Sequence, residues 1–253
     1  MSEWIIPDWP APQRVQACST LRHGGVSTAP WDSLNLGAHV GDAETHVLQN
    51  RQYLRDKLLP AVPQWLNQVH GQDVVRLPAE DAIPNADAAI TRETDVVCAV
   101  MTADCLPVLF CSFDGSEVAA AHAGWRGLCN GVLEQTLQQF QSPASEIHVW
   151  LGPAIGPEAF EVGAEVREAF MAHDAQADAA FLPAGDKYFA NIWQLARQRL
   201  QAAGVHSISG SQRCTFTDAD DFFSYRRDGN TGRMATLIWR PEERRVGTAC
   251  RSR

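Results

Sequence analysis

Cys105 and His122 flank a predicted β-hairpin and are the first candidates for chemistry in this chain. Two short apolar, β-prone runs surround an Asp-Gly dipeptide at residues 114–115, which suits a tight type I′ turn. With that dipeptide at the centre of the turn, Cys105 lies opposite Gly124, and His122 is its diagonal neighbour on the same face. Diagonal cross-strand partners lie roughly 7–8 Å apart, within reach of one bridging metal ion or of a thiol–imidazole contact. The two runs are residues 108–111 and 118–121.

The length of the turn decides whether these two side chains meet. A four-residue loop centred on the same dipeptide keeps Cys105 and His122 on one face of the hairpin. A three-residue loop places them on opposite faces, because side chains alternate along a strand. The pairing of Cys105 with His122 is therefore a prediction about the turn as well as about the strands.

His70 is the third candidate. Residues 65–70 alternate so that Gln68 and His70 share one face of a predicted strand, and Gly71 permits a close approach or a bulge beyond it. Residues 74–77 are then predicted to be the hairpin partner of that strand. His, Cys and His suit a catalytic zinc ion, which takes three protein ligands and keeps one position open for water or substrate. No fourth Cys or His follows at finger-like spacing, which favours an open site.

Each candidate also has a purely structural alternative. A single Cys or His in an apolar strand usually packs in the core. Cys105 differs because an acid precedes it and a histidine shares its face. Asp104, that acid, either orients a metal ligand or caps the turn. We expect simple packing for the remaining cysteines in apolar segments, which are Cys18, Cys98, Cys111 and Cys214.

Several arginines lie beside glycine-rich loops, where they could bind an anion. The alternative for any one of them is a solvated or salt-bridged surface side chain. A helix predicted to begin just past Gly127 could add free N–H groups and a positive dipole end to an anion site near His122. The arginines are Arg22, Arg126, Arg226, Arg227 and Arg233.

The composition is that of an ordinary globular protein, with 45% hydrophobic and 20% charged residues among 253. A net charge of −9 disfavours a nucleic-acid partner and suits a small substrate better. No signal peptide or membrane-spanning segment is predicted. The seven cysteines are odd in number and scattered, which favours a reducing, cytoplasmic setting. The sequence leaves the oligomeric state open.

Alternating helical and strand patterns predict one domain of mixed α/β content over residues 1–253. Asp42 is predicted to cap a helix that runs to residue 59. Val47, Leu48, Leu54 and Leu58 would form its buried side, and Arg51 and Arg55 its solvated side. Asn191 is predicted to cap a second amphipathic helix that ends near Gly204.

Several separate motifs, in the right order, resemble a bacterial family first called multicopper polyphenol oxidase or laccase-domain proteins. That family is now described as purine nucleoside phosphorylases and as a peptidoglycan editing factor. The likeness spans nearly the whole chain. The motifs are Arg22-His-Gly-Gly-Val-Ser27, Leu34-Asn35-Leu36-Gly37, Asn67-Gln68-Val-His70-Gly71, Thr102-Ala-Asp104-Cys105-Leu-Pro107-Val108, Ala121-His122-Ala-Gly124-Trp125-Arg126-Gly127, Phe160-Glu-Val-Gly163, and Phe223-Ser-Tyr-Arg226-Arg227 through Thr231-Gly232-Arg233.

The resemblance implies a four-layer α/β/β/α sandwich. It also implies a metal, usually zinc with copper possible, at His70, Cys105 and His122, which would be the catalytic residues. The implied reactions are phosphorolysis of adenosine, inosine and methylthioadenosine, deamination of adenosine, and removal of wrongly charged UDP-muramyl-serine precursors. The candidate substrate-binding residues, all within the matched motifs, are Arg22, Asn35, Gln68, Arg126 and Arg226.

Two activities attached to this family fit the residues poorly. Multicopper oxidation needs further His-rich sites, and none of the eight histidines forms a His-x-His pair. The zinc-deaminase signature, His-x-Glu followed by Pro-Cys-x-x-Cys, is also missing, so deamination would use a differently built site.

The leading hypothesis is a zinc-dependent enzyme that acts on purine nucleosides and phosphate. The first alternative is a cysteine hydrolase or amidase in which Cys105 is the nucleophile and His122 its base. A copper-dependent polyphenol oxidase and a non-catalytic module with a structural metal are the others. The structural-metal alternative is weakened by the missing fourth ligand.

Overall fold

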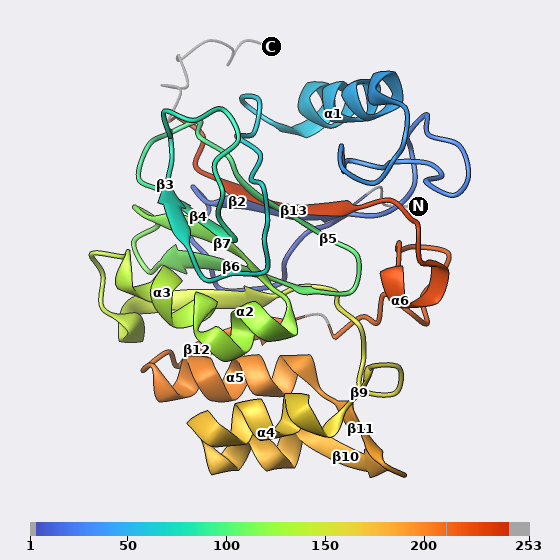
Figure 1. Ribbon diagram of the computed structural model, residues 1–253. Helices are drawn as coiled ribbons and strands as arrows, with labels where there is room; N and C mark the ends of the chain where they lie inside the picture. Colours follow the sequence, from blue (N-terminus) through green and yellow to red (C-terminus); the bar gives the residue numbers. More distant parts are fainter. Residues whose placement is uncertain (1–3, 211, 243–253) are drawn as a thin grey trace, which may run out of the picture.

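The computed structural model describes residues 4–210 and 212–242, which form four layers (Figure 1). Helix α1, Glu44–Leu58, covers one face of a four-stranded sheet. The other face of that sheet packs on a six-stranded sheet, and a group of helices covers the far side. This arrangement confirms the expected mixed α/β fold and its α/β/β/α layers.

The four-stranded sheet joins the two ends of the described chain. Its order is β1-β2-β13-β5, with antiparallel neighbours throughout. Strand β13, near the C-terminus, therefore lies between β2 and β5. The bounds are Trp4–Ile5 for β1, Gln16–Thr20 for β2, Met234–Trp239 for β13 and Cys98–Thr102 for β5.

The six-stranded sheet has the order β12-β8-β6-β7-β4-β3 and mixed pairing. The two outer pairs, β12 with β8 and β3 with β4, are parallel, and the inner pairs are antiparallel. The central strands are buried on both faces, which explains their continuous apolar sequence. The bounds are Ser207–Gly210, Ile147–Leu151, Leu106–Ser112, Val118–Ala123, Ala88–Thr91 and Val74–Arg76, in sheet order.

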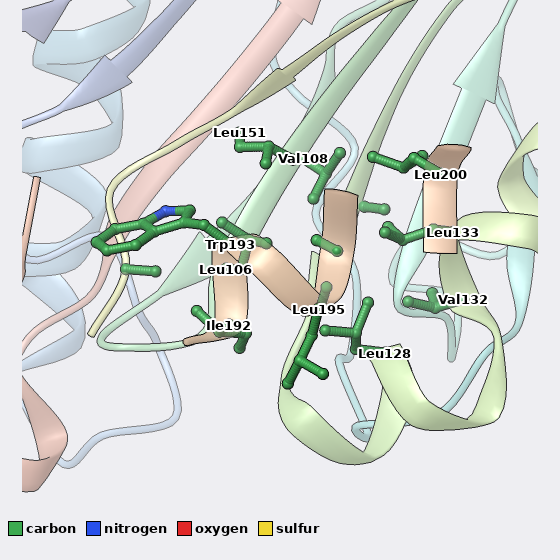
Figure 2. Close-up of a cluster of buried hydrophobic side chains, with 14 of the residues drawn as sticks. Leu106, Val108, Leu128, Val132, Leu133, Leu151, Ile192, Trp193, Leu195 and Leu200 are labelled. Atoms are coloured by element: carbon green, nitrogen blue, oxygen red, sulfur yellow. The ribbon is translucent and has the colours of Figure 1, made fainter. Parts of the chain in front are cut away.

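Helices cover the outer face of this sheet. Figure 2 shows apolar side chains of the helices, among them Trp193 and Leu195 of α5, in one cluster with Val108 of β6 and its paired residue Leu151 of β8. The helices on this face are α2 (Trp125–Asn130), α3 (Val132–Gln138) and α5 (Ile192–Ala202), and α4 (Ala164–His173) lies outside α5 (Figure 1). The smaller elements are β9 (Glu161–Val162), β10 (Phe181–Ala184), β11 (Lys187–Ala190), α6 (Tyr225–Asp228), and the 3₁₀ helices η1 (Ala144–Glu146) and η2 (Ala175–Ala180).

Apolar side chains fill all three gaps between the layers. Leu54 and Leu237 lie between α1 and the first sheet, and Val100 and Leu109 lie between the two sheets. Val108 and Leu195 lie between the second sheet and the outer helices. Within the described part of the chain, no helix has the length and apolar character needed to cross a bilayer.

The hairpin of β6 and β7 has the predicted register. Pro107 pairs with His122 and Leu106 with Ala123, so Cys105 follows in line with Gly124. Its turn is not the predicted type I′. The backbone carbonyl of Ser112 accepts from the N–H of Gly115, and the backbone N–H of Ser112 donates to the carbonyl of Glu117. This pairing leaves a four-residue loop, residues 113–116. Of the central pair of this loop, Gly115 alone has a positive φ, 68°. A loop of this length preserves the parity, so the side chains still meet.

The segment before the second sheet differs from the prediction. Residues 65–70 do not form a strand, and only Asn67 makes an isolated bridge, with Asn85. His70 has a φ of 59°, which an extended strand excludes. Consequently β3 is not a hairpin partner of this segment; it pairs in parallel with β4.

Helix α1 also departs from its predicted faces. Leu48 is 57% exposed, whereas the polar side chain of Asn50 is buried. Arg51, expected on the solvated side, stacks 4.3 Å over Trp65 and donates to the carbonyl of Leu36. The helix packs around a polar loop rather than against an apolar sheet alone, and Asn50 and Arg51 supply the donors that the loop carbonyls need.

Two of the three predicted helix starts differ from the structure. Asp42 does not cap α1, because the N-cap residue is Ala43; the Asp42 carboxylate instead accepts from Ser27 and Asn35. The helix predicted to begin past Gly127 begins earlier, at Trp125, and the left-handed Gly131 separates it from α3. The Asn191 cap on α5 is confirmed.

Candidate metal centre

His70, Cys105 and His122 meet at one point on the molecule. Their candidate ligand atoms all lie within 4.8 Å of one another. The Sγ of Cys105 is 4.0 Å from Nε2 of His70, and the two imidazole rings stand edge to face with centroids 4.9 Å apart. Cys105 immediately precedes β6, His122 lies on β7, and His70 comes from the loop before β3. Three separate segments therefore build one His-Cys-His group.

Asp87 is the residue of this group that sequence reasoning missed. It is fully buried next to β4, and its Oδ1 lies 2.8 Å from Nδ1 of His122. The same carboxylate accepts from the backbone N–H of His70 at 3.0 Å. An acid at the start of a buried strand was a possible signal, because a buried carboxylate requires partners.

The electrostatics of the metal-free group favour a thiolate beside an imidazolium. Burial tends to raise the pKa of Cys105, but the neighbouring His122 and His70 outweigh it and lower that pKa to about 6. Burial tends to lower the pKa of His122, whereas Cys105 and the hydrogen bond to Asp87 raise it to about 9. A deprotonated sulfur is the form that both a metal ion and a nucleophilic reaction require.

Gly124 permits the three side chains to approach. A Cβ at this position would lie 3.0 Å from Cδ2 of His70, 3.1 Å from Sγ of Cys105 and 3.8 Å from Cε1 of His122. The space beside the donor atoms therefore exists because residue 124 has no side chain. Two nitrogens and one sulfur around a small space suit a zinc ion with an open coordination position.

A cavity of about 570 Å³ opens beside this group. Among the predicted substrate-binding residues, Gln68, Arg126 and Arg226 line it. Sequence reasoning did not include four other lining side chains in the substrate-binding set: His39, Phe160, Tyr225 and Arg233. The cavity therefore combines cationic groups with aromatic rings.

Three arginines of the cavity have no carboxylate partner among the described residues. The Arg126 guanidinium lies 4.4 Å over the ring of Trp125, and that of Arg226 donates to the carbonyl of Glu161. Arg233 donates to backbone carbonyls alone, and burial lowers its pKa. Burial together with Arg233 and Arg51 lowers the pKa of His39. This uncompensated positive charge would attract an anion.

Comparison with known proteins agrees with this geometry. The profile of the family described as "Multi-copper polyphenol oxidoreductase laccase" matches residues 16–241. The chain belongs to this family. Sequence relatives include the "Purine nucleoside phosphorylase YfiH" of Escherichia coli strain K12, 61% identical, and a purine nucleoside phosphorylase of Pseudomonas aeruginosa, 54% identical. Each alignment covers 94% of this chain and 99% of the relative.

Solved structures with 33–46% sequence identity have the same fold. A Neisseria meningitidis protein, 46% identical, superposes with a TM-score of 0.90 over 95% of this chain and all of its own. YlmD from Geobacillus stearothermophilus, 33% identical, superposes with a TM-score of 0.85 over 95% and 97% of the two chains. In this member of the family, the described residues contain one group of three candidate metal ligands, fewer than multicopper chemistry requires.

Arg22 and Asn35, both in family motifs, lie outside the cavity. Arg22 donates to the carbonyls of Asp32 and Ala219. Asn35 is fully buried, and its side-chain NH₂ donates to the carbonyl of Gly37. Its side-chain oxygen accepts from the backbone N–H groups of Gly37 and Arg233. These contacts support loop structure, and Asn35 reaches the cavity only through Arg233.

Gln68 and Asp104 are at the cavity but are already engaged. The Gln68 amide exchanges two hydrogen bonds with the backbone of Met101, both 2.7 Å long. The Asp104 carboxylate accepts from Thr215 Oγ1 and from the backbone N–H of Arg226, each at 2.7 Å. Asp104 thus ties α6, which carries Tyr225 and Arg226, to the residue next to Cys105. It contacts none of the three candidate ligands through its side chain.

Proposed function

We propose that this protein is a zinc-dependent purine nucleoside phosphorylase acting on adenosine, inosine and methylthioadenosine in the cytoplasm. The observation that carries the proposal is the open His70–Cys105–His122 group beside a cavity lined by unpaired arginines. The names of the close relatives support the same reaction.

The donor set would hold zinc through two imidazole nitrogens and the Cys105 thiolate. When bound, zinc supplies positive charge that stabilises anionic oxygen atoms and lowers the pKa of a water ligand. Asp87 orients His122 by accepting a hydrogen bond from its Nδ1–H, which leaves Nε2 for the ligand group. The three candidate ligand atoms lie within 4.8 Å of one another, which supports this assignment.

The arginines and rings would bind the two substrates. Arg126, Arg226 and Arg233 supply the charge that a phosphate dianion needs, and arginine pairs well with phosphate oxygens. Phe160 and Tyr225 offer apolar surface for a purine base. In phosphorolysis, an oxygen of hydrogen phosphate bonds to C1′ of the ribose as the bond from C1′ to the base nitrogen breaks. The electron pair of that bond leaves with the nitrogen, which takes up the proton of hydrogen phosphate, so the base leaves neutral.

The proposal includes two further activities that the family resemblance suggests. Adenosine deamination would add water at the base carbon that carries the amino group and release that group as ammonia, which leaves inosine. Hydrolysis of wrongly charged UDP-muramyl-serine would break an amide bond there. The size of the cavity, about 570 Å³, is compatible with ligands larger than a single phosphate.

Cys105→Ala tests the proposal. The control is Cys214→Ala, which removes another partly exposed thiol. We expect about one zinc per chain and phosphate-dependent release of the base in the wild type and in Cys214→Ala. Both should be lost in Cys105→Ala, since the variant lacks one of three ligands. Full turnover by metal-free wild type would refute the proposal.

The contribution of the arginines can be separated in the same assay. We expect Arg126→Gln to raise the KM for phosphate by about tenfold, because hydrogen bonds to charged groups contribute about 1.5–3 kcal/mol. Arg22→Gln serves as the control, since Arg22 lies outside the cavity. An equal change in the two variants would remove the argument for phosphate binding by Arg126.

A cysteine hydrolase is the second candidate, supported by a specific geometry. In this interpretation Cys105 is the nucleophile, His122 is its base, and Asp87 is the carboxylate that orients His122. The pKa of Cys105 is lowered to about 6. This alternative predicts that chelated enzyme keeps its activity and loses it on alkylation of Cys105. The phosphorylase proposal predicts that chelation abolishes turnover while the far-UV circular dichroism of the fold is retained.

A further inference from the structure

We infer that Asp87 is a positioning residue that presets two of the three ligands from different parts of the chain. The inference rests on the metal site of the proposed function. Asp87 lies outside the ligand set but contacts both histidine-bearing segments. The four polar contacts of its carboxylate divide into a loop side and a strand side.

On the loop side, three successive N–H groups converge on one carboxylate. Oδ2 accepts from Val69 at 3.2 Å and from Gly71 at 2.7 Å, and Oδ1 accepts from His70 at 3.0 Å. His70 itself has a left-handed backbone, with a φ of 59°. A non-glycine residue adopts this conformation only where its surroundings hold it. The carboxylate therefore fixes the turn that directs the His70 ring toward Cys105.

On the strand side, Asp87 fixes the tautomer of His122. The two residues are opposite each other across β4 and β7, and the N–H of His122 donates to the carbonyl of Asp87 at 2.7 Å. The carboxylate Oδ1 lies 2.8 Å from Nδ1 of the same ring. An ionised carboxylate only accepts hydrogen bonds, so Nδ1 carries the proton and Nε2 remains the donor atom of the ligand group.

Asp87→Asn should separate this role from simple core packing. The asparagine amide has one accepting oxygen, so it cannot replace both carboxylate oxygens. With its oxygen in the place of Oδ1, the NH₂ group opposes the N–H groups of Val69 and Gly71. In the flipped orientation, the NH₂ group opposes Nδ1–H of His122 and the N–H of His70. We expect the dissociation constant for zinc to rise by about 10- to 100-fold, the range for partners of metal-bound histidine.

Glu117→Gln is the matched control. Glu117 is also a buried carboxylate, 2% exposed, and accepts from the backbone N–H groups of Gln141 and Ser142 and from Arg92. It contacts no residue of the ligand group. We expect Glu117→Gln to lower thermal stability and to leave the zinc dissociation constant unchanged.

Zinc affinity, measured by competition with a chromophoric chelator, gives distinct outcomes. Wild type that binds no zinc would defeat the proposed function, and the inference with it. If Asp87→Asn binds zinc as tightly as the wild type does, the inference is overturned and the proposed function is not. Should Asp87→Asn fail to fold, nitrogen NMR of zinc-loaded wild type decides. A proton on Nδ1 of His122 supports the inference, and a proton on Nε2 overturns it.

Discussion

At the scale of single residues, the chemistry depends on how close three side chains come. His70, Cys105 and His122 are ordinary residue types, and their donor atoms become a group because they lie within 4.8 Å of one another. Gly124 allows that distance, and the mutual charges of Cys105 and His122 set the protonation state. Both features lead to direct tests.

Gly124→Ala should weaken metal binding with little loss of fold stability. The added methyl group would lie 3.0 Å from His70 and 3.1 Å from Cys105, shorter than ordinary contact, so the ligand atoms must spread. Gly71→Ala is the control, because its methyl group would meet Asp87 and Val69 at 3.5 and 3.6 Å. We expect zinc content to fall in Gly124→Ala only. Equal zinc content in the two variants would show that residue 124 does not limit the site.

The thiol of Cys105 should react as a thiolate in the metal-free protein at neutral pH. Its pKa is lowered to about 6, so the rate of alkylation by iodoacetamide should rise through that pH and level off above it. In His122→Ala the main charge that lowers the pKa is lost, and the midpoint should move upward. Mass spectrometry of the peptide that contains Cys105 measures this rate. A midpoint that His122→Ala leaves in place would exclude the thiolate–imidazolium pair.

At the scale of elements, a hairpin and a loop bring the ligands together. The four-residue turn between β6 and β7 keeps Cys105 and His122 on one side of the hairpin. Asp104 then anchors α6 beside Cys105 through the N–H of Arg226. The outer helices, in contrast, support the sheet from the other side through apolar packing.

Removal of the α5 cap should therefore affect stability and leave the metal site intact. The side chain of Asn191 accepts from the N–H of Gln194 at 3.0 Å. We expect Asn191→Ala to lower the free energy of unfolding by about 1 kcal/mol, and Asn191→Asp, which can still accept, to lower it less. Urea denaturation gives these values, and zinc content checks the site. Loss of zinc in Asn191→Ala would show that α5 and the site are coupled.

At the scale of the whole molecule, three apolar layers hold four structural layers together. Leu109 is fully buried between the two sheets, where β6 contacts the first sheet. Strand β6 also begins directly after Cys105, and Leu66 of the same apolar layer lines the cavity. The stability of the molecule should depend on this layer more than on the exposed face of α1.

Leu109→Ala and Leu48→Ala compare those two places with the same chemical change. We expect a loss of about 2–5 kcal/mol for Leu109→Ala, which leaves a cavity in the core. Leu48 is 57% exposed, so Leu48→Ala should change the free energy of unfolding by less than about 0.5 kcal/mol. Guanidinium denaturation followed by tryptophan fluorescence measures both. Similar losses would mean that α1 buries Leu48 in solution.

The amino-acid sequence alone determined those features that depend on local patterns. The register of the β6–β7 hairpin and the pairing of Cys105 with His122 follow from alternation once the turn parity is given, and the Asn191 cap follows from the residue type before a helical pattern. The hairpin and the cap need few long-range contacts, so the spacing of residues is enough to predict them. The four-layer fold, in contrast, was expected from the family motifs.

Only the tertiary structure decided the rest. His70 lies in a left-handed loop because the N–H groups of this loop find the carboxylate of Asp87, a partner 17 residues away. Arg22 and Asn35 bond loop carbonyls and amides instead of lining the cavity, whereas Arg233 reaches it from the far end of the chain. Hydrogen bonds between distant segments leave no periodic pattern in the sequence, so they become visible only when the layers are assembled.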